Sequence, residues 1–383
     1  MQTTSWTLLD VEQGIHLDPF HCSEETSVAL AGTDHWSVSM RRLRGGISEG
    51  VDVVEIDNGR LKFSVLPTRG MGLWKGTCDG LDLGWKSPVT LPVHPTYVNA
   101  LDRNGIGWLA GFNEWLCRCG LDSNGPPTDS ATLHGRIANL PAHTLRLRVD
   151  PAGEIELTGI VDEAQMFGPR LQLTSTVKTR AGSNRLTIVD TVANLGSKPA
   201  DLELLYHINQ GPPFLEAGAK LVAPIREVSA RNARALEGLD TFDEYAAPDS
   251  AYSEQVYLFD LAQEPGKKTI AMLRSADGSK GFSVHYDSSQ MPCFTQWKNT
   301  QAIEDGYVTG LEPGTNYPNP KSYERQQGRV IALAPRGSHT IELELAVHST
   351  KAAVQEVERE IAAAQATTTR TVHRSLQPKF AAP

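Results

Sequence analysis

The stretch "NRLTIVDTVANLGSKPADLELLYHINQG", residues 184–211, decides the fold class. Apolar and polar residues alternate along its two halves, and glycine and proline lie between and after them. Alternation with a period of two predicts β-strands, and the Gly and Pro positions predict turns. The same pattern recurs in segments 59–70, 154–162, 170–180, 280–288 and 339–349. We therefore predict a mostly β protein, built as one large antiparallel β-sandwich with few helices.

The best helix candidate lies near the C-terminus. Residues 350–366, "TKAAVQEVEREIAAAQA", are rich in Ala, Glu and Gln, which favour helix. No change of composition marks a linker, and no repeat of fixed period is visible. We expect one sandwich domain over residues 1–350, with roughly the first 45 residues peripheral, followed by a helix and an extended tail over 351–383.

Composition and charge argue against several classes of partner. The chain has 383 residues, of which 40% are hydrophobic, and a formal net charge of −9. No cluster of Lys and Arg offers a surface for nucleic acid or for an anionic membrane, so we expect neither partner. The N-terminus has no basic, apolar leader, no long apolar run is present, and the 5 cysteines follow no disulfide pattern. We therefore expect a cytoplasmic protein.

Two of the 11 histidines stand in unusual contexts, and the first is His134 in "LHGRIANLP". If residues 133–136 are extended, His134 and Arg136 point to the same side of the strand. Such a pair, beside a glycine that permits close approach, would suit a polar ligand such as a sugar. The alternative is a strand histidine that bonds a backbone carbonyl.

The second histidine, His207, follows the apolar run "LLY" in "LLYHINQGPP". His207 and Asn209 share one face of this predicted strand, because strand residues two positions apart lie on the same side, and we expect Asn209 to bind the substrate. A histidine at this position is partly desolvated and can still face a cleft. A histidine with a purely structural role is again the alternative.

Glu312 stands in "GLEPGTNYPNPK", residues 310–321. Tyr307, Val308 and Leu311 predict a strand that leads into this stretch. Pro313 restricts Glu312 to an extended conformation, so we expect the carboxylate near a strand end, on a stiff connection. Rigid strand ends are favoured positions for catalytic groups, whereas a glutamate chosen at random is usually solvated.

Five further residues are candidates for ligand binding. Trp297 and Lys298 in "FTQWKN" are expected at the floor of a cleft, where an indole face can stack on a sugar ring; a core Trp is the alternative. Arg69 in "LPTRGMG" and Asn113 with Glu114 in "GFNEW" are polar residues in glycine-flanked loops.

The motifs give no support to metal, nucleotide or serine-hydrolase chemistry. Cys117 and Cys119 share one strand face, but no partner pair completes a four-ligand zinc site, so we expect no metal. The sequence has no GxGxxG after a strand, no Walker loop and no GxSxG elbow.

The order of these motifs resembles that of the aldose 1-epimerase, or galactose mutarotase-like, superfamily. Members carry a His in an "HG" motif, a second His before an Asn at a strand end, and a Glu in an "EP" motif near the C-terminus. His134, His207 and Glu312 match these motifs in order and approximate spacing. The resemblance covers roughly residues 45–350 and is greatest to a divergent bacterial branch. It implies a supersandwich with the site on a concave sheet face.

The resemblance also implies acid–base chemistry on a sugar, without a cofactor. Glu312, ionised at neutral pH, would act as the base and His207, protonated, as the acid when a cyclic hemiacetal opens. His134 and Arg136 would hold substrate hydroxyls or stabilise charge that develops on oxygen. The stretch "NQGPPFLEAG" replaces the aromatic residues that usually follow the second His motif, which leaves the identity of the sugar open.

Two other functions fit the same residues. An epimerase or lyase could remove a proton beside the carbonyl of a keto sugar or sugar acid, and a non-catalytic protein could bind a carbohydrate on the same sandwich. In each case the partner is a small-molecule carbohydrate. The C-terminal tail could also pack on a second copy in a homo-oligomer.

Overall fold

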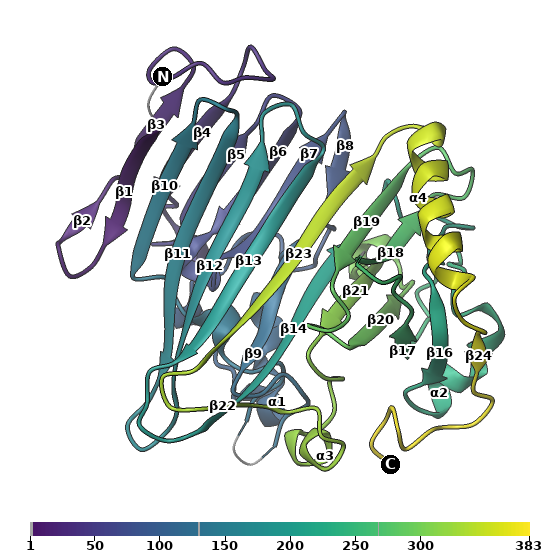
Figure 1. Ribbon diagram of the computed structural model, residues 1–383. Coiled ribbons are helices and arrows are strands. Elements are labelled where there is room, and N and C mark those ends of the chain that lie inside the picture. The colour runs from purple at the N-terminus through teal and green to yellow at the C-terminus, as the bar shows by residue number, and fades with distance from the viewer. Residues whose placement is uncertain (1–2, 129–130, 267) are drawn as a thin grey trace.

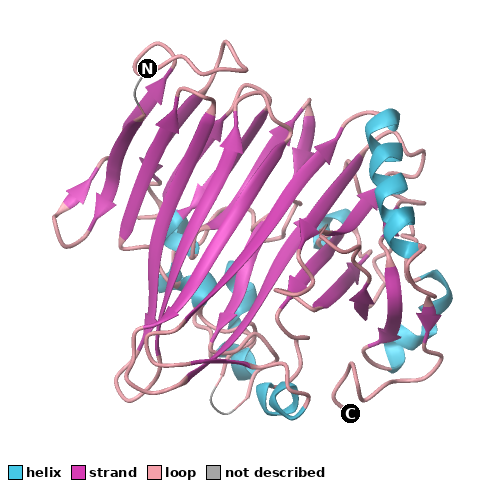
Figure 2. Cartoon of the chain, in the orientation of Figure 1, coloured by secondary structure: helices cyan, strands magenta, loops and turns pink. Residues whose placement is uncertain are grey.

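The protein is a sandwich of two large β-sheets with few helices (Figures 1 and 2). The computed structural model describes residues 3–128, 131–266 and 268–383. Within these residues, neighbouring strands are antiparallel except for β16 and β24, which are parallel. No helix in this described part has the length and apolar character needed to span a bilayer.

The first sheet has 10 strands and begins and ends with short edge strands. In spatial order its strands are β15 (Lys220–Val222), β18 (Thr269–Arg274), β19 (Gly281–Tyr286), β23 (Ser338–His348), β13 (Arg185–Asn194), β12 (Arg170–Arg180), β11 (Glu154–Ala164), β10 (Thr144–Asp150), β1 (Thr4–Asp10) and β2 (Ile15–His16).

The second sheet has 14 strands and carries the candidate site described below. Its main path is β24 (Thr371–Val372), β16 (Ile225–Ala230), β17 (Gln255–Leu261), β20 (Cys293–Asn299), β21 (Val308–Gly314), β14 (Ala200–Gln210), β9 (Leu116–Leu121), β7 (Gly72–Cys78), β6 (Leu61–Leu66), β5 (Asp52–Asp57), β4 (Ser37–Arg42) and β3 (Phe20–Ser23). Two short strands join it from the side, β22 (Ile331–Leu333) on β14 and β8 (Leu81–Leu83) on β7.

Helices are few and mostly short. The α-helices are α1 (Asp102–Gly105), α2 (Ala233–Glu237), α3 (Lys321–Gln326) and α4 (Lys351–Gln365). Single 3₁₀ turns occur at Gly46–Ser48, Pro67–Arg69, Pro95–Tyr97, Gly107–Gly111, Ile137–Asn139, Leu239–Thr241 and Ile303–Asp305. The longest helix, α4, lies beside β18 and β23 along one side of the molecule (Figure 1).

The main hydrophobic core lies between the two sheets, and β14 shows how the second sheet divides its side chains. Leu204, Tyr206 and Ile208 belong to the main core. The residues between them, including His207 and Asn209, point to the opposite face, because successive strand residues alternate. That outer face is covered by loops rather than by the first sheet, so it can carry a cavity.

The predicted fold class is confirmed. Each segment with period-two alternation contains a strand, namely β6, β11, β12, β13, β14, β19 or β23, and the predicted helix is α4. The first 45 residues, expected to be peripheral, supply edge strands to both sheets and also bury Leu8, Trp36 and Val38 in the main core. The C-terminal tail, which we expected to be extended, packs back on its own chain: β24 pairs with β16, and Phe380 is fully buried.

Candidate active site

A cavity of about 320 Å³ lies on the outer face of the second sheet. Its floor comes from strands β14, β20 and β21, and its walls come mainly from residues 106–112, 125–126, 133–134 and 318. The residues that line it are Ile106, Trp108, Leu109, Phe112, Gly125, Pro126, Leu133, His134, His207, Arg231, Glu254, Val256, Thr295, Trp297, Glu312 and Pro318.

Strand register places His207 and Glu312 side by side on the floor. β14 and β21 pair Leu205 with Gly314 and Ile208 with Leu311, so His207 falls directly opposite Glu312. On the next strand, β20, Thr295 pairs with Glu312. Glu312 lies two residues before the end of β21, close to the strand end as predicted.

The two side chains approach each other closely. His207 Nε2 lies 3.2 Å from Glu312 Oε1, and the residues are 5% and 3% exposed. Gly310 makes room for the carboxyl group, because a Cβ at this position would lie 2.2 Å from Glu312 Oε1. Among the described residues Oε1 has no hydrogen-bond partner, and neither has the buried hydroxyl of Thr295 beside it. Glu312 Oε1 and the hydroxyl oxygen of Thr295 therefore remain available to a ligand.

Asn209 fixes the tautomer of His207. The amide Nδ2 of Asn209 donates to the carbonyl oxygens of Glu114, at 2.9 Å, and His207, at 3.3 Å. Its Oδ1 therefore faces His207 Nδ1, at 2.7 Å, and an amide oxygen can only accept. The proton of the neutral imidazole accordingly lies on Nδ1, which leaves Nε2 as an acceptor toward the cavity.

Burial favours the neutral form of both groups. It raises the pKa of the Glu312 carboxyl well above its ordinary value, and it lowers the pKa of the His207 imidazole to about 3. The contact between them is therefore an approach of a neutral acid and a neutral imidazole rather than an ion pair. This differs from the ionised Glu312 and protonated His207 that we expected at neutral pH, because the ordinary pKa values of exposed groups do not hold in this dry position.

Aromatic rings enclose the pair. The ring of His207 lies 5.0 Å from Phe112 and 5.4 Å from Trp297, and that of His134 lies 4.8 Å from Trp108. The two imidazoles are 5.6 Å apart. Trp297 thus lines the cavity, as part of an aromatic enclosure around the pair.

His134 reaches the cavity from a turn, and our expectation of an extended segment is wrong. His134 has φ 57° and Gly135 φ 72°, both in the left-handed region, so His134 and Arg136 do not share a strand face. Arg136 is exposed, donates to Gln165 and is not among the residues that line the cavity. His134 is held instead by its Nδ1, which lies 3.0 Å from the carbonyl oxygen of Asn124.

Arg69 and Glu114 form a buried ion pair, with Arg69 Nη2 at 2.8 Å from Glu114 Oε1 and both side chains fully buried. Arg69 also donates to the Gly111 carbonyl at 2.9 Å, and the Glu114 carbonyl accepts from Asn209. Neither side chain lines the cavity, so their place is behind it. The pair stabilises the loop that carries Phe112, and the Glu114 carbonyl holds the side-chain amide of Asn209, which orients His207.

Asn113 and Lys298 also lie outside the cavity lining. Asn113 is buried, and among the described residues its side-chain amide has no hydrogen-bond partner. Lys298 follows Trp297 in β20, so the two side chains must point to opposite faces. Lys298 Nζ donates to the Thr241 carbonyl at 2.8 Å on the far side, which excludes it from the floor where we expected it.

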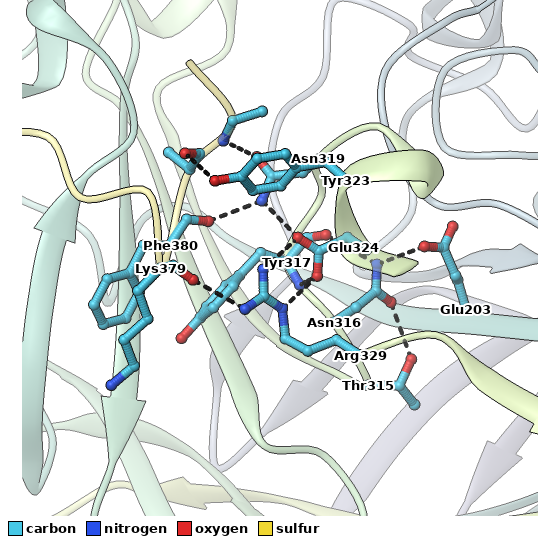
Figure 3. Close-up of polar contacts among 12 residues, drawn as sticks. Glu203, Thr315, Asn316, Tyr317, Asn319, Tyr323, Glu324, Arg329, Lys379 and Phe380 are labelled. Carbon is cyan, nitrogen blue, oxygen red and sulfur yellow. Dashed lines mark hydrogen bonds and ion pairs between the residues drawn. The ribbon is translucent and has the colours of Figure 1, made fainter. Parts of the chain in front are cut away.

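The C-terminal tail is held by polar contacts with the segment that follows β21 (Figure 3). Buried Glu324 accepts two hydrogen bonds from Arg329, each 2.6 Å long, and one from Asn319 at 2.7 Å. Asn319 in turn donates to the Phe380 carbonyl at 2.8 Å. The ring of Phe380 belongs to a small apolar cluster with Val256, against which Trp297 also packs. The tail therefore backs two residues of the cavity wall.

A second polar chain connects this region to His134. Asn316, four residues beyond Glu312, exchanges side-chain hydrogen bonds with Asn124, at 2.8 and 3.1 Å. Asn316 also donates to Glu203, as drawn in Figure 3. Since the Asn124 carbonyl holds His134, the position of this histidine depends on contacts outside the cavity.

A larger cavity of about 490 Å³ lies elsewhere, lined by residues that include Lys62, Lys75, Lys86, Asp82 and Trp85. None of the described residues that line it is a histidine. Across the described ranges, no group of three or more His, Cys, Asp or Glu side chains is placed to hold a metal ion. We therefore assign the candidate active site to the smaller cavity.

Sequence reasoning missed Trp108, Phe112, Arg231, Glu254 and Thr295 of the cavity lining. Thr295 lies two residues before Trp297 in β20 and therefore on the same face of the strand, so the spacing from Trp297 could have indicated it. The other four come from connections and strand ends far away in sequence, and no short motif marks them.

Solved structures share this architecture. The structure of a candidate aldose 1-epimerase from Klebsiella pneumoniae matches with a TM-score of 0.94 and 34% identity, over 98% of this chain and 99% of that chain. A galactose mutarotase-like protein from Clostridium acetobutylicum matches with a TM-score of 0.57 and 16% identity, over 86% and 98%. Galactose 1-epimerase from Lactobacillus acidophilus matches with a TM-score of 0.53 and 12% identity, over 81% and 98%. The last two matches show the fold alone.

The chain thus has a galactose mutarotase-like fold. The family model described as "Domain of unknown function (DUF4432)" matches residues 48–347, so the chain belongs to that family. No curated protein matches the sequence significantly.

Proposed function

We propose that this protein is an aldose 1-epimerase-like isomerase that interconverts the anomers of a sugar. The observation that carries the proposal is the 3.2 Å approach of His207 Nε2 to Glu312 Oε1 on the floor of an enclosed cavity. The hydroxyl oxygen and the ring oxygen of a cyclic hemiacetal are bonded to one carbon. An acid and a base must therefore stand close together to serve both oxygens at once.

Ring opening starts from the neutral pair. His207 Nε2 accepts the proton of the anomeric hydroxyl while the Glu312 carboxyl gives its proton to the ring oxygen. The carbonyl forms, the bond between the anomeric carbon and the ring oxygen breaks, and the two side chains become an imidazolium and a carboxylate. Their attraction at this separation stabilises the charges that the reaction creates in a dry cavity.

Ring closure uses the same groups with their roles exchanged. After rotation about the bond next to the carbonyl, Glu312 recovers the proton of the sugar hydroxyl as that oxygen attacks the opposite face. His207 returns its proton to the carbonyl oxygen, which becomes the new anomeric hydroxyl. Glu312 is thus the acid in opening and the base in closing. Protons are only exchanged between these two residues and the sugar, so the cycle needs no cofactor.

The test follows anomer equilibration of freshly dissolved pure anomers by polarimetry and by NMR. Glu312→Gln and His207→Gln should each lower kcat by about 10²–10⁴-fold, because an amide cannot exchange the required proton. Glu163→Gln is the matched control: Glu163 is also a buried carboxyl whose pKa is raised by burial, but it lies on β11 outside the cavity. Its turnover should stay within about twofold of the wild type.

Other outcomes would contradict the proposal. Full anomer exchange in Glu312→Gln would remove Glu312 from the chemistry. Incorporation of solvent deuterium on carbon, without anomer exchange, would favour the epimerase or lyase that abstracts a proton beside a carbonyl. Sugar binding without any turnover would favour a binding protein.

A further inference from the structure

Arg231 is the residue with a permanent positive charge among the described residues that line the site cavity. It follows the last residue of β16, and its backbone N–H donates to the Val256 carbonyl at 3.0 Å. Arg231 is half-buried and lines the cavity. The acid–base chemistry described above does not use this group.

The guanidinium of Arg231 is unengaged. Within the described ranges, no hydrogen bond and no ion pair joins it to another side chain or to a carbonyl, so its donors are free for a ligand. Glu254, the acidic residue of the same wall, is engaged by contrast: its Oε2 accepts from Trp297 Nε1 at 2.6 Å. The cavity thus presents one free cation to a ligand, whereas the neighbouring carboxylate already holds the indole.

The spacing between Arg231 and the acid–base pair suits one sugar. Arg231 lies at the end of β16, and Glu312 lies on β21, with β17 and β20 between them. Three strand spacings separate their backbones by about 14 Å across the sheet. Both side chains extend into the cavity and shorten this gap. A sugar whose anomeric carbon lies over Glu312 would therefore turn its far end toward Arg231.

We propose that the substrate carries an anionic group, a carboxylate or a phosphate, on the end remote from the anomeric carbon, and that Arg231 binds it. The inference rests on the proposed function, which supplies the orientation of the sugar. A guanidinium is suited to this task because its planar set of N–H donors binds carboxylate and phosphate oxygens in pairs.

The experiment compares three ligands that differ in one substituent: D-glucose, D-glucuronate and D-glucose 6-phosphate. Calorimetry gives Kd for each ligand, and polarimetry gives kcat/KM, with the wild type, Arg231→Ala, Arg231→Lys and Arg226→Ala. Arg226 is the matched control, an arginine of β16 that pairs with Asp260 at 2.7 Å outside the cavity. The carboxylate and phosphate arms show which anion the site prefers.

The wild type should bind at least one anionic sugar about tenfold to hundredfold more tightly than D-glucose, as expected for charge-assisted hydrogen bonds. Arg231→Ala should abolish this ratio, Arg231→Lys should keep part of it, and Arg226→Ala should leave it unchanged. Equal Kd values for the charged and neutral sugars, tighter binding of D-glucose than of both anions, or equal effects of the two alanine variants would overturn the inference. Selective binding of an anionic sugar without turnover would instead contradict the proposed function and leave the ligand class standing.

Discussion

His207 Nδ1 and Asn209 Oδ1 lie 2.7 Å apart, and this short contact decides which nitrogen of the imidazole faces the cavity. The two residues are neighbours on one face of β14, so the strand itself delivers the orienting amide. The Glu114 carbonyl holds that amide from behind. The acid–base chemistry proposed for Glu312 and His207 therefore depends on Asn209, which we expected to bind the substrate but which is not among the residues that line the cavity.

Asn209→Ala should lower kcat by about tenfold to hundredfold, because it removes the hydrogen bond that selects the tautomer. Asn209→Asp distinguishes a positioning role from a purely structural one, because only a positioning role predicts a change in the pH profile of kcat. A carboxylate beside Nδ1 favours the imidazolium, so the pKa of His207 should rise from about 3. The acid limb of the kcat–pH profile should move to higher pH by the same amount. An unmoved acid limb in this variant would contradict the positioning role.

Glu312→Gln should make the protein more stable at neutral pH while it loses activity. The folded state keeps Glu312 protonated because burial raises its pKa, whereas the unfolded chain releases this proton above a pKa of about 4.3. In that window the native state binds more protons, so its free energy of unfolding falls as pH rises. The Glu312→Gln substitution removes this fall in the free energy of unfolding, because an amide side chain does not ionise. Tm should exceed that of the wild type by roughly 2–4 °C for each kcal/mol recovered, and the difference should grow between pH 5 and pH 8. A lower Tm at every pH would indicate a structural role.

Acid should destabilise the fold through three histidines that are buried in the neutral form. Burial lowers the pKa of His207 and His285 to about 3 and that of His348 to about 4. The unfolded chain takes up these protons near pH 6.5, so the free energy of unfolding should fall as pH falls from 6.5 toward 4. Urea titrations at several pH values measure this slope. His285→Gln should flatten it by one proton, which is about 1.4 kcal/mol per pH unit. An unchanged slope in this variant would show that His285 is not buried neutral.

Trp297→Ala should raise Kd for the accepted sugar by about tenfold, because a stacking ring and its buried area are lost, and Trp297→Phe should recover part of the loss. Lys298→Met is the control variant at the neighbouring position. Its side chain points to the opposite face of β20, so sugar binding should persist even where the protein melts earlier. Loss of binding in Lys298→Met with an unchanged Tm would place Lys298 in the site after all.

Phe380→Ala should cost about 3–5 kcal/mol, the usual effect of emptying a fully buried aromatic position. Because Phe380 backs Val256 and Trp297, KM should rise as well. Leu376→Ala is the control within the same tail, since Leu376 is 44% exposed. Thermal unfolding and steady-state kinetics of the two variants separate these effects. Equal Tm losses would show that the tail is held by its polar contacts alone.

Strand periodicity accounts for what the sequence could predict. It predicts the strands β14 and β21 and places His207 and Glu312 near the ends of these strands. That the two residues lie side by side follows from the register in which β14 and β21 pair. The catalytic roles of the two residues stay predictions. Arg136 was misplaced because residues 134 and 135 adopt left-handed backbone, which an extended reading ignores. Lys298 could have been excluded by strict alternation with Trp297. The protonation states could not be read from the sequence, because they depend on burial by Phe112, Trp108 and other residues far along the chain.

The attachment of the C-terminal tail sets an order of assembly during synthesis. Ribosomes add residues from the N-terminus onward, so His207 and Glu312 can meet as soon as β14 and β21 pair. Phe380, which backs the cavity wall, is added more than sixty residues after Glu312. We therefore expect that in a nascent chain one wall of the cavity around His207 and Glu312 stays incompletely packed until Phe380 has left the exit tunnel. The pocket would then mature only after Phe380 has emerged, well after strands β14 and β21 have formed.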